Sequence, residues 1–275
     1  MSTGTLRIVA NQALPKLRKE PVPREAFDKE LDRVLASGVT WFELFSGSDI
    51  GSERSLIADR FVAEDTRVLD VGCGRGFFSF ACAMRTESVT ALDLMDGGGR
   101  TGWWDEFMKT SYLMGNSQRI SGVRSSAVFL PFGRGSFDLV ASIHAIRNFQ
   151  SKDEIRGFFH EAINVLKEGG RLVVAESDLE CPLNAGYRAM YAMRTKLGWE
   201  LELPTASQMV RWLQDEGFAD VKLETIETDL DYAPISFPFD ETKLGDMKQE
   251  YEIATKLIRE DDNRSPPVLL ITATR

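Results

Sequence analysis

Four residues at alternating positions, Asp70, Gly72, Gly74 and Gly76, point most directly to chemistry in this sequence. Glycines permit a positive φ and let a ligand approach the backbone where a Cβ would collide. The N–H groups at the start of a helix lack partners within that helix, so a ligand at such a turn can bind them. The run therefore indicates a ligand-binding turn with an acid beside it. A glycine turn without a ligand is the alternative.

The elements on either side of this turn favour a ligand. Residues 68–71 form an apolar run typical of a strand, and residues 77–84 carry apolar side chains at helical spacing. A dinucleotide fingerprint, G-x-G-x-x-G, would require glycine where Phe77 stands. The pattern D-x-G-x-G-x-G instead resembles motif I of the class I S-adenosylmethionine (SAM)-dependent methyltransferases. That resemblance implies SAM as the cofactor, with the acid and the glycine backbone holding its methionine part.

Two later segments extend this resemblance to the rest of the cofactor. Asp93 ends the next predicted strand, residues 88–93, where a carboxylate can accept both ribose hydroxyls. Residues 125–132 are similar to the methyltransferase run G-D-A-x-x-L-P-F, with Ser126 in place of the acid that bonds the adenine amino group. A hydroxyl can still accept that bond. The cofactor set implied by the resemblance is Asp70, Gly72, Cys73, Gly74, Gly76, Asp93, Leu94, Ser126, Ala127 and Ser142.

The end of the fourth predicted strand, residues 136–143, lies where this family transfers the methyl group. His144 follows it, and an imidazole with an ordinary pKa near 6.5 can accept a proton from a nucleophile. A His144 that is packed in the core or touches the cofactor is the alternative. The residues expected to contact the acceptor are Trp41, Trp103, Arg147 and Glu176.

The passage from Arg147 to Ser177 is similar to the ubiquinone/menaquinone-biosynthesis C-methyltransferases. A Y-D-x-M-N run and an S-x-x-x-H-x-x-W run, which mark the N-terminal region of that family, are absent from this sequence. The similarity therefore supports the fold and does not assign a quinone as the acceptor.

Composition narrows the class of protein. A chain of 275 residues with 43% hydrophobic residues can bury the core of one large domain. A net charge of −9 gives no general attraction to nucleic acid or to an anionic membrane, which favours a small-molecule acceptor. Three cysteines without C-x-x-C spacing indicate neither a disulfide framework nor a zinc site. No apolar run has the length of a spanning helix, and we expect a cytoplasmic protein without a metal.

Strands and helices alternate along the chain, which predicts a doubly wound α/β sheet. The family resemblance implies a seven-stranded Rossmann-like methyltransferase sheet whose last strand is antiparallel. Residues 1–62 are expected to be an N-terminal helical cap of the same domain, with residues 1–22 as a loosely packed leader. Residues 63–275 are expected to be the SAM-dependent methyltransferase domain, with an inserted helix at 185–196 as a substrate lid.

Three other functions remain open. A nucleotide-dependent oxidoreductase is disfavoured by Phe77, which occupies the place of a required glycine. A non-catalytic module that binds SAM or a partner on the same fold agrees with the lack of an acceptor motif. A protein or RNA methyltransferase would need a basic groove on the surface.

Overall fold

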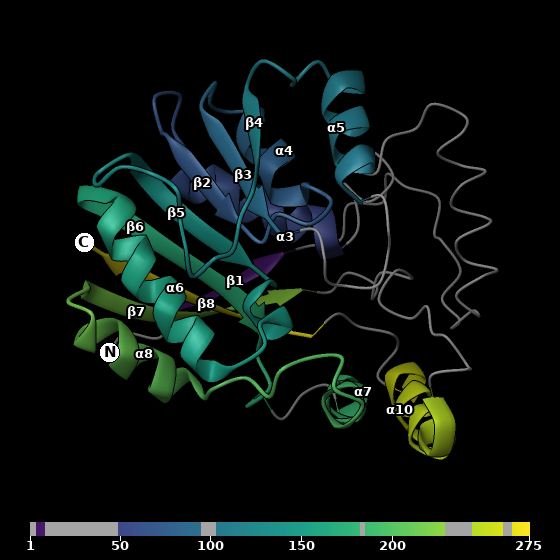
Figure 1. Ribbon diagram of the computed structural model, residues 1–275. Helices are drawn as coiled ribbons and strands as arrows, with labels where there is room; N and C mark the ends of the chain where they lie inside the picture. Colours follow the sequence, from purple (N-terminus) through teal and green to yellow (C-terminus); the bar gives the residue numbers. More distant parts are fainter. Residues whose placement is uncertain (1–3, 9–48, 95–102, 182–184, 229–243, 261–265) are drawn as a thin grey trace.

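The computed structural model describes residues 4–8, 49–94, 103–181, 185–228, 244–260 and 266–275. One twisted sheet runs through the molecule, with helices on both of its faces (Figure 1). The strands of the sheet are β1 (Gly4–Ile8), β2 (Val68–Val71), β3 (Val89–Asp93), β4 (Ile120–Arg124), β5 (Phe137–Ile143), β6 (Leu166–Ser177), β7 (Ala219–Thr228) and β8 (Val268–Thr274).

The strand order confirms the predicted fold. Across the sheet it is β1-β7-β8-β6-β5-β2-β3-β4, and β8 is antiparallel to both β6 and β7 while the other pairs are parallel. Without β1, this is the seven-stranded methyltransferase arrangement with its last strand antiparallel. The carboxyl ends of β2, β3 and β5 therefore meet at one edge, where ligands bind in open α/β sheets.

One part of the N-terminal prediction was wrong. We expected residues 1–22 to be a loosely packed leader, but Gly4–Ile8 forms the edge strand β1 and pairs in parallel with β7, from Gly4 opposite Glu224 to Ile8 opposite Thr228. The pairing is with a strand near the far end of the sequence, so the local pattern carried no signal of it.

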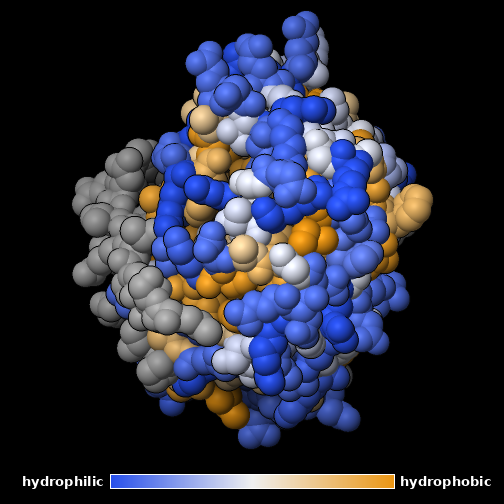
Figure 2. Space-filling model, turned by 90° about the vertical axis from the view of Figure 1, so that its left-hand side faces the viewer, coloured by the Kyte–Doolittle hydropathy of each residue, from blue (hydrophilic) through white to orange (hydrophobic). Residues whose placement is uncertain are grey.

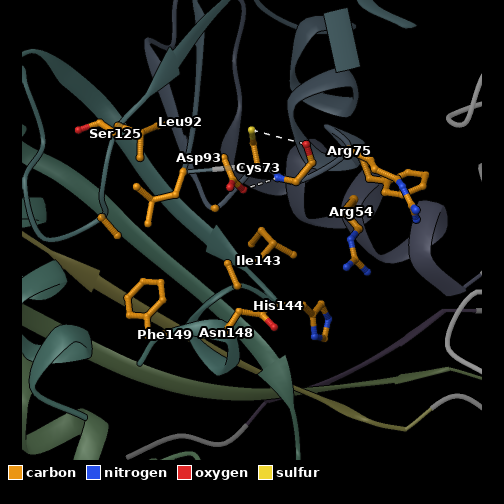
Figure 3. A pocket seen from close by; sticks show the side chains of 16 residues that line it. Arg54, Cys73, Arg75, Leu92, Asp93, Ser125, Ile143, His144, Asn148 and Phe149 are labelled. Carbon is orange, nitrogen blue, oxygen red and sulfur yellow. Dashed lines mark hydrogen bonds between the residues drawn. The ribbon is translucent and has the colours of Figure 1, made fainter. Parts of the chain in front are cut away.

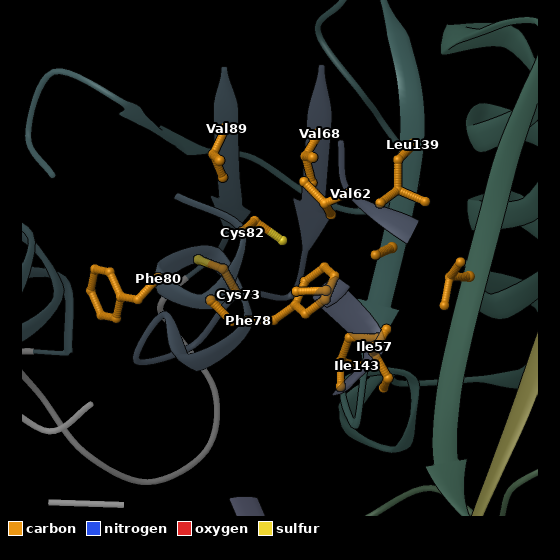
Figure 4. Close-up of a cluster of buried hydrophobic side chains, with 14 of the residues drawn as sticks. Ile57, Val62, Val68, Cys73, Phe78, Phe80, Cys82, Val89, Leu139 and Ile143 are labelled. Atoms are coloured by element: carbon orange, nitrogen blue, oxygen red, sulfur yellow. The ribbon is translucent and has the colours of Figure 1, made fainter. Parts of the chain in front are cut away.

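One face of the sheet is covered by the helices that precede and follow β2. Apolar side chains of α3 (Asp49–Phe61) and α4 (Phe77–Ala83) pack on β2, β3 and β5 in a continuous buried cluster (Figure 4). Helix α5 (Trp103–Leu113) joins this cluster through Phe107, whose ring stacks on Phe80 with centroids 5.5 Å apart. This packing fixes the start of α4 and the glycine turn before it.

The opposite face is covered by α6 (Lys152–Val165) and α8 (Ala206–Asp215), which bury a second cluster that includes Phe158, Phe159 and Leu213. Both helices begin with a side-chain cap. Ser151 accepts a hydrogen bond from the N–H of Glu154, and Thr205 forms a reciprocal capping box with Gln208.

The boundary between α6 and β6 precedes the glycine pair at 169–170, although glycine commonly ends a helix. The helix ends at Val165 instead, and β6 begins at Leu166, which pairs with Phe137 of β5. Leu166 is fully buried in the second cluster, so apolar packing ends the helix earlier than the glycines would.

A third cluster lies outside the two faces of the sheet. It joins α7 (Ala185–Lys196) to α10 (Lys248–Glu260), which the 3-10 helix η3 (Gly245–Met247) precedes. Gly186 allows the close approach of these helices, because an added Cβ would stand 2.3 Å from the backbone nitrogen of Ile258. A further 3-10 helix, η1 (Ile146–Asn148), follows β5.

The face of the molecule shown in Figure 2 is largely hydrophilic, with hydrophobic side chains gathered beside the grey atoms. No helix in the described ranges is both long and apolar enough to cross a membrane.

Candidate functional site

The glycine turn has the backbone that the sequence predicts. Gly72, Gly74 and Gly76 have φ values of 75°, 51° and 84°, in the left-handed region that favours glycine. Gly72 also lies directly against Ala145, since an added Cβ would stand 2.3 Å from the Ala145 Cβ. The turn after β2 therefore packs on the turn after β5.

Asp93 connects this turn to the end of β3. Its Oδ2 accepts a hydrogen bond from the N–H of Gly74 at 2.8 Å, drawn as a dashed line in Figure 3. The carbonyl of Leu92 accepts the N–H groups of Gly72 and Cys73 at 2.8 and 3.1 Å. These bonds hold the carboxylate of Asp93 at the edge of the glycine turn.

A cavity of about 370 Å³ opens at this edge. Its polar lining comes from Arg54, Arg75, Asp93, Ser125, His144 and Asn148, and glycine and apolar residues form the rest. In Figure 3, Leu92 and Ser125 lie on one side of Asp93, and His144 and Arg54 lie on the other. The cavity thus has an apolar region beside Asp93 and an opposite end with an arginine and a histidine.

The cofactor residues expected from the sequence divide into two groups. Six line the cavity: Gly72, Cys73, Gly74, Asp93, Leu94 and Ala127. The other four, Asp70, Gly76, Ser126 and Ser142, lie outside the described lining. Ser125 lines the cavity in place of its neighbour, and Ser142 is buried with no hydrogen-bond partner for its Oγ among the described residues.

Asp70 lies beneath the glycine turn. Its side chain is buried, and Oδ2 accepts a hydrogen bond from Ser79 Oγ at 2.5 Å. Burial raises the pKa of Asp70 to about 7, although the bond from Ser79 opposes this shift. Asp70 is therefore close to the balance between its neutral and charged forms at neutral pH.

His144 lies at the end of the cavity that Arg54 shares. Its φ of 53° is left-handed, which is uncommon for a residue with a side chain. Nε2 is 3.0 and 3.1 Å from the two carboxylate oxygens of Glu53, and Nδ1 is 2.9 Å from Nη2 of Arg147. Because arginine only donates, this geometry assigns the proton of the neutral ring to Nε2, which donates to Glu53.

Arg147 and Glu176, expected to contact an acceptor, are paired with each other. Nε of Arg147 donates to Oε2 of Glu176 at 2.8 Å, and Nη2 contacts the same oxygen. Nη1 donates to the hydroxyl of Tyr187 at 2.5 Å, and Nη2 also contacts Ser177 Oγ at 3.0 Å. Both members of the pair are buried and lie outside the described lining of the cavity.

Burial and neighbouring charges act in opposite directions on the pKa values of these groups. Burial lowers the pKa of His144, but Glu53 and Glu176 together outweigh burial and Arg54, and the pKa is raised above its ordinary value. Burial raises the pKa of Glu176, but Arg147 and His144 outweigh it, and this pKa is lowered. Burial also raises the pKa of Glu53, but the opposing interactions, of which His144 gives the largest, lower this pKa below its ordinary value. Two carboxylates, Glu53 and Glu176, therefore flank the imidazole of His144 and the guanidinium of Arg147.

Two of the expected acceptor residues cannot be placed. Trp41 lies outside the described residues, and Trp103 begins α5 but its side chain is not described. Several residues of the site were not predicted, among them Glu53, Arg54 and Tyr187. Glu53 and Arg54 lie within α3, where the helical pattern of the sequence marks only the apolar face. In the described ranges, no group of three or more His, Cys, Asp or Glu could hold a metal ion.

Comparison with known proteins agrees with this geometry. Residues 69–174, which include the glycine turn, Asp93 and His144, match a family model described as a methyltransferase domain. The match covers less than half of this chain and shows that this segment resembles a methyltransferase domain. The demethylmenaquinone methyltransferase of Tropheryma whipplei is 31% identical to it over 117 residues, which are 42% of this chain and 43% of that protein. The match thus spans less than half of the curated relative.

Solved structures share the fold of the methyltransferase domain at low identity. A putative methyltransferase from Bacillus halodurans is 20% identical, with a TM-score of 0.53 over 82% of this chain and 98% of that one. Geranyl diphosphate methyltransferase in complex with SAM is 14% identical, with a TM-score of 0.56 over 89% of each chain. The [4+2]-cyclase SpnF is 16% identical, with a TM-score of 0.57 over 93% of this chain and 98% of that one.

Substitution of Gly72 tests the contact between the two turns. We expect Gly72→Ala to destabilise the protein and to weaken SAM binding at least tenfold, because the new methyl group overlaps Ala145. Gly115→Ala is the matched control, since Gly115 has a similar φ of 69° but nothing within 4 Å of an added Cβ. Both variants bear the strain of a positive φ, of order 1 kcal/mol. The difference between the two variants in SAM affinity, measured by calorimetric titration, and in stability, measured by urea unfolding, therefore reports the overlap with Ala145 alone. Equal effects in the two variants would contradict the account.

Burial of Asp70 predicts a pH-dependent loss of stability. Between about pH 4 and 7 the unfolded chain releases this proton while the folded protein keeps it, so the free energy of unfolding falls as pH rises, by at most roughly 1.4 kcal/mol per pH unit. Asp70→Asn is neutral in both states. We expect its stability relative to wild type to rise over this window and to level off above pH 7.

Urea unfolding of both proteins from pH 5 to 8 measures this difference. Asp138→Asn serves as the control, because Lys167 helps to hold the pKa of Asp138 below its ordinary value and that carboxylate is ionised throughout the window. A difference for Asp70→Asn that does not change with pH would show that Asp70 is ionised in the folded protein.

Proposed function

We propose that this protein transfers a methyl group from SAM to a small, partly apolar acceptor. The observation that carries the proposal is the cavity itself, where a positive-φ glycine turn and an acid at the end of β3 lie beside an apolar wall. The residues present fit the cofactor, since Gly72 and Gly74 offer backbone without a Cβ at the cavity wall.

Each part of the cofactor has a proposed partner. Asp93 would accept the ribose hydroxyls, with Ser125 and Ala127 beside the adenine. Backbone at Gly72, Cys73 and Gly74 would border the methionine part. We add Arg54 as the group that binds its carboxylate, because this guanidinium from α3 lines the cavity on the side of His144.

The remaining four expected residues would act from behind the cavity wall. Asp70 supports the glycine turn through Ser79, and Gly76 begins α4 at a φ that glycine favours. Ser126 Oγ accepts the N–H of Val128 at 3.3 Å and so shapes the turn that carries Ser125. Ser142 is buried at the end of β5, directly before the residues that line the cavity. Leu94 would extend the apolar wall on the adenine side.

When bound, SAM supplies a methyl group already activated by its sulfonium. The protein then contributes mainly by positioning the acceptor in line and excluding water. We propose His144 as the proton acceptor, with Glu53 fixing its tautomer. Its Nδ1 faces Arg147 in this structure, so proton transfer to His144 requires the guanidinium to move away from that nitrogen. Glu176 and Arg147 would then bound the acceptor end.

The domain and its location are further parts of this proposal. We propose that residues 1–62 belong to the same domain as residues 63–275, since Glu53 and Arg54 of α3 reach the site. Trp41 and Trp103 remain candidates for the acceptor pocket. The three cysteines are free in the structure, which agrees with a reducing cytoplasm.

A second candidate function is SAM binding without methyl transfer. The likeness in fold to SpnF, a [4+2]-cyclase, favours it, because the same architecture there carries a different named reaction. Formation of S-adenosylhomocysteine on addition of an acceptor separates the two candidates. With SAM that carries a radiolabelled methyl group, a protein or RNA acceptor would also form S-adenosylhomocysteine, and the label would appear on the macromolecule.

Substitution of Asp93 tests the cofactor. We expect calorimetric titration of wild type to show micromolar binding of SAM and S-adenosylhomocysteine. Asp93→Asn keeps an acceptor for the Gly74 N–H but loses the charge, and we expect affinity to fall about tenfold, as loss of a charged hydrogen bond of about 1.5–3 kcal/mol implies. Asp93→Ala should reduce it further.

The control and the competing cofactor complete this experiment. Asp178→Asn alters an acid that follows β6 and bonds the loop N–H groups of Glu180 and Cys181, so affinity for SAM should not change. Binding of NADH alone, or equal affinity in wild type and Asp93→Ala, would contradict the proposal.

A further inference from the structure

The phenol of Tyr187 connects the helix pair α7–α10 to the cluster around Arg147. The Tyr187 ring belongs to the apolar core that α7 and α10 share, a core separate from the two that cover the sheet. Its hydroxyl leaves that core and accepts hydrogen bonds from Nη1 of Arg147 at 2.5 Å and from Ser177 Oγ at 2.9 Å. Packing of the helix pair therefore determines where this oxygen lies.

The guanidinium of Arg147 transmits that position to His144. A guanidinium is planar and rigid, so an anchor at Nη1 fixes the direction of Nη2. Nη2 has two hydrogens but three acceptors within reach: Glu176 Oε2, Ser177 Oγ at 3.0 Å and His144 Nδ1 at 2.9 Å. A small rotation of the group thus decides whether His144 receives one of these hydrogens.

We infer that Tyr187 is a positioning residue of the methyl-transfer site, which holds the Arg147 guanidinium against Nδ1 of His144 and so sets the orientation of the imidazole. Its importance for turnover rests on the proposed function, in which His144 takes a proton. The contact itself does not depend on that function. Nδ1 is the ring nitrogen left after Nε2 binds Glu53, so the guanidinium controls the lone pair that an acceptor would use.

Charged groups from three elements face His144, and Arg147 is the one that Tyr187 anchors directly. Glu53 and Arg54 come from α3, Glu176 from β6, and Arg147 from η1. Tyr187→Phe keeps the ring in its apolar core and removes only the oxygen. A change in the pKa or the tautomer of His144 therefore reports movement of the Arg147 guanidinium.

Tyr191 offers a matched control on the same helix. Its ring lies in the same core, and its hydroxyl also forms buried hydrogen bonds, to the carbonyl of Leu201 and from the N–H of Leu203. Tyr191→Phe thus removes a comparable oxygen, one helical turn away, whose hydrogen bonds go to the backbone of Leu201 and Leu203 and not to the guanidinium of Arg147. The N–H of Leu201 donates to the backbone carbonyl of Arg147. An effect that merely reflects loosening of α7 would be the same in both variants.

The experiment is nuclear magnetic resonance titration of the ¹⁵N-labelled imidazoles. The chain has two histidines, so His160→Gln assigns the signals of His144. In Tyr187→Phe we expect the pKa of His144 to rise by about half a unit or more, because a nearby cation withdraws, and the neutral ring to lose its preference for a proton on Nε2. In Tyr191→Phe both should match wild type.

Ser177→Ala gives a second variant with the opposite sign. Removing this acceptor leaves Nη2 with Glu176 and His144 alone, so the contact to Nδ1 should strengthen and the pKa of His144 should fall. If Tyr187→Phe does not fold, the His144 titration in Ser177→Ala tests the inference by itself. Superimposable His144 titrations in wild type and in the folded variants, or equal shifts in Tyr187→Phe and Tyr191→Phe, would overturn the inference.

Calorimetry on the same samples separates this inference from the proposed function. SAM affinity should be equal in wild type, Tyr187→Phe and Tyr191→Phe, since none of these changes lines the cavity. Absence of SAM binding by wild type would refute the function while the titration still tests the contact. Once an acceptor is known, kcat should fall in Tyr187→Phe and not in Tyr191→Phe.

Discussion

The buried ion pair between Arg147 and Glu176 is the constraint around which the acceptor end of this protein is organised. Taking two charges out of water costs several kcal/mol for each, so the arrangement persists only with good geometry and further hydrogen bonds. Two nitrogens of Arg147 contact one oxygen of Glu176, and Tyr187, Ser177 and His144 surround the guanidinium. One pair thus joins β6, η1 and α7, and through His144 it reaches α3.

The cofactor end depends on backbone geometry instead of charge. Gly72 packs on Ala145, the residue directly after His144. The glycine turn and the charged cluster therefore meet through adjacent residues of one short segment. Because of this contact, a ligand in the cavity at the ends of β2 and β3 lies close to His144. The cofactor and the acceptor are therefore expected on either side of the turn after β5.

Local patterns in the sequence predicted the parts of the fold that depend on neighbouring residues. The strand-turn-helix around Gly74 and the strand that ends in Asp93 are each encoded within a few consecutive positions. Glu53 and His144 are 91 positions apart, and Arg147 and Tyr187 are 40 apart, so their contacts left no periodic signal. Arg147 and Glu176 were identified as polar groups at strand ends, but only the folded sheet reveals that they neutralise each other. The pairing of β1 with β7 was missed for the same reason.

The crystal structure of the protein with S-adenosylhomocysteine tests the central claim most directly. The account predicts the ribose on the carboxylate of Asp93, the methionine carboxylate near Arg54, and the sulfur on the side of the cavity where His144 lies. Ligand bound elsewhere on the molecule, or a cavity still empty of ligand after saturation at millimolar concentration, would contradict the assignment of this cavity as the SAM site.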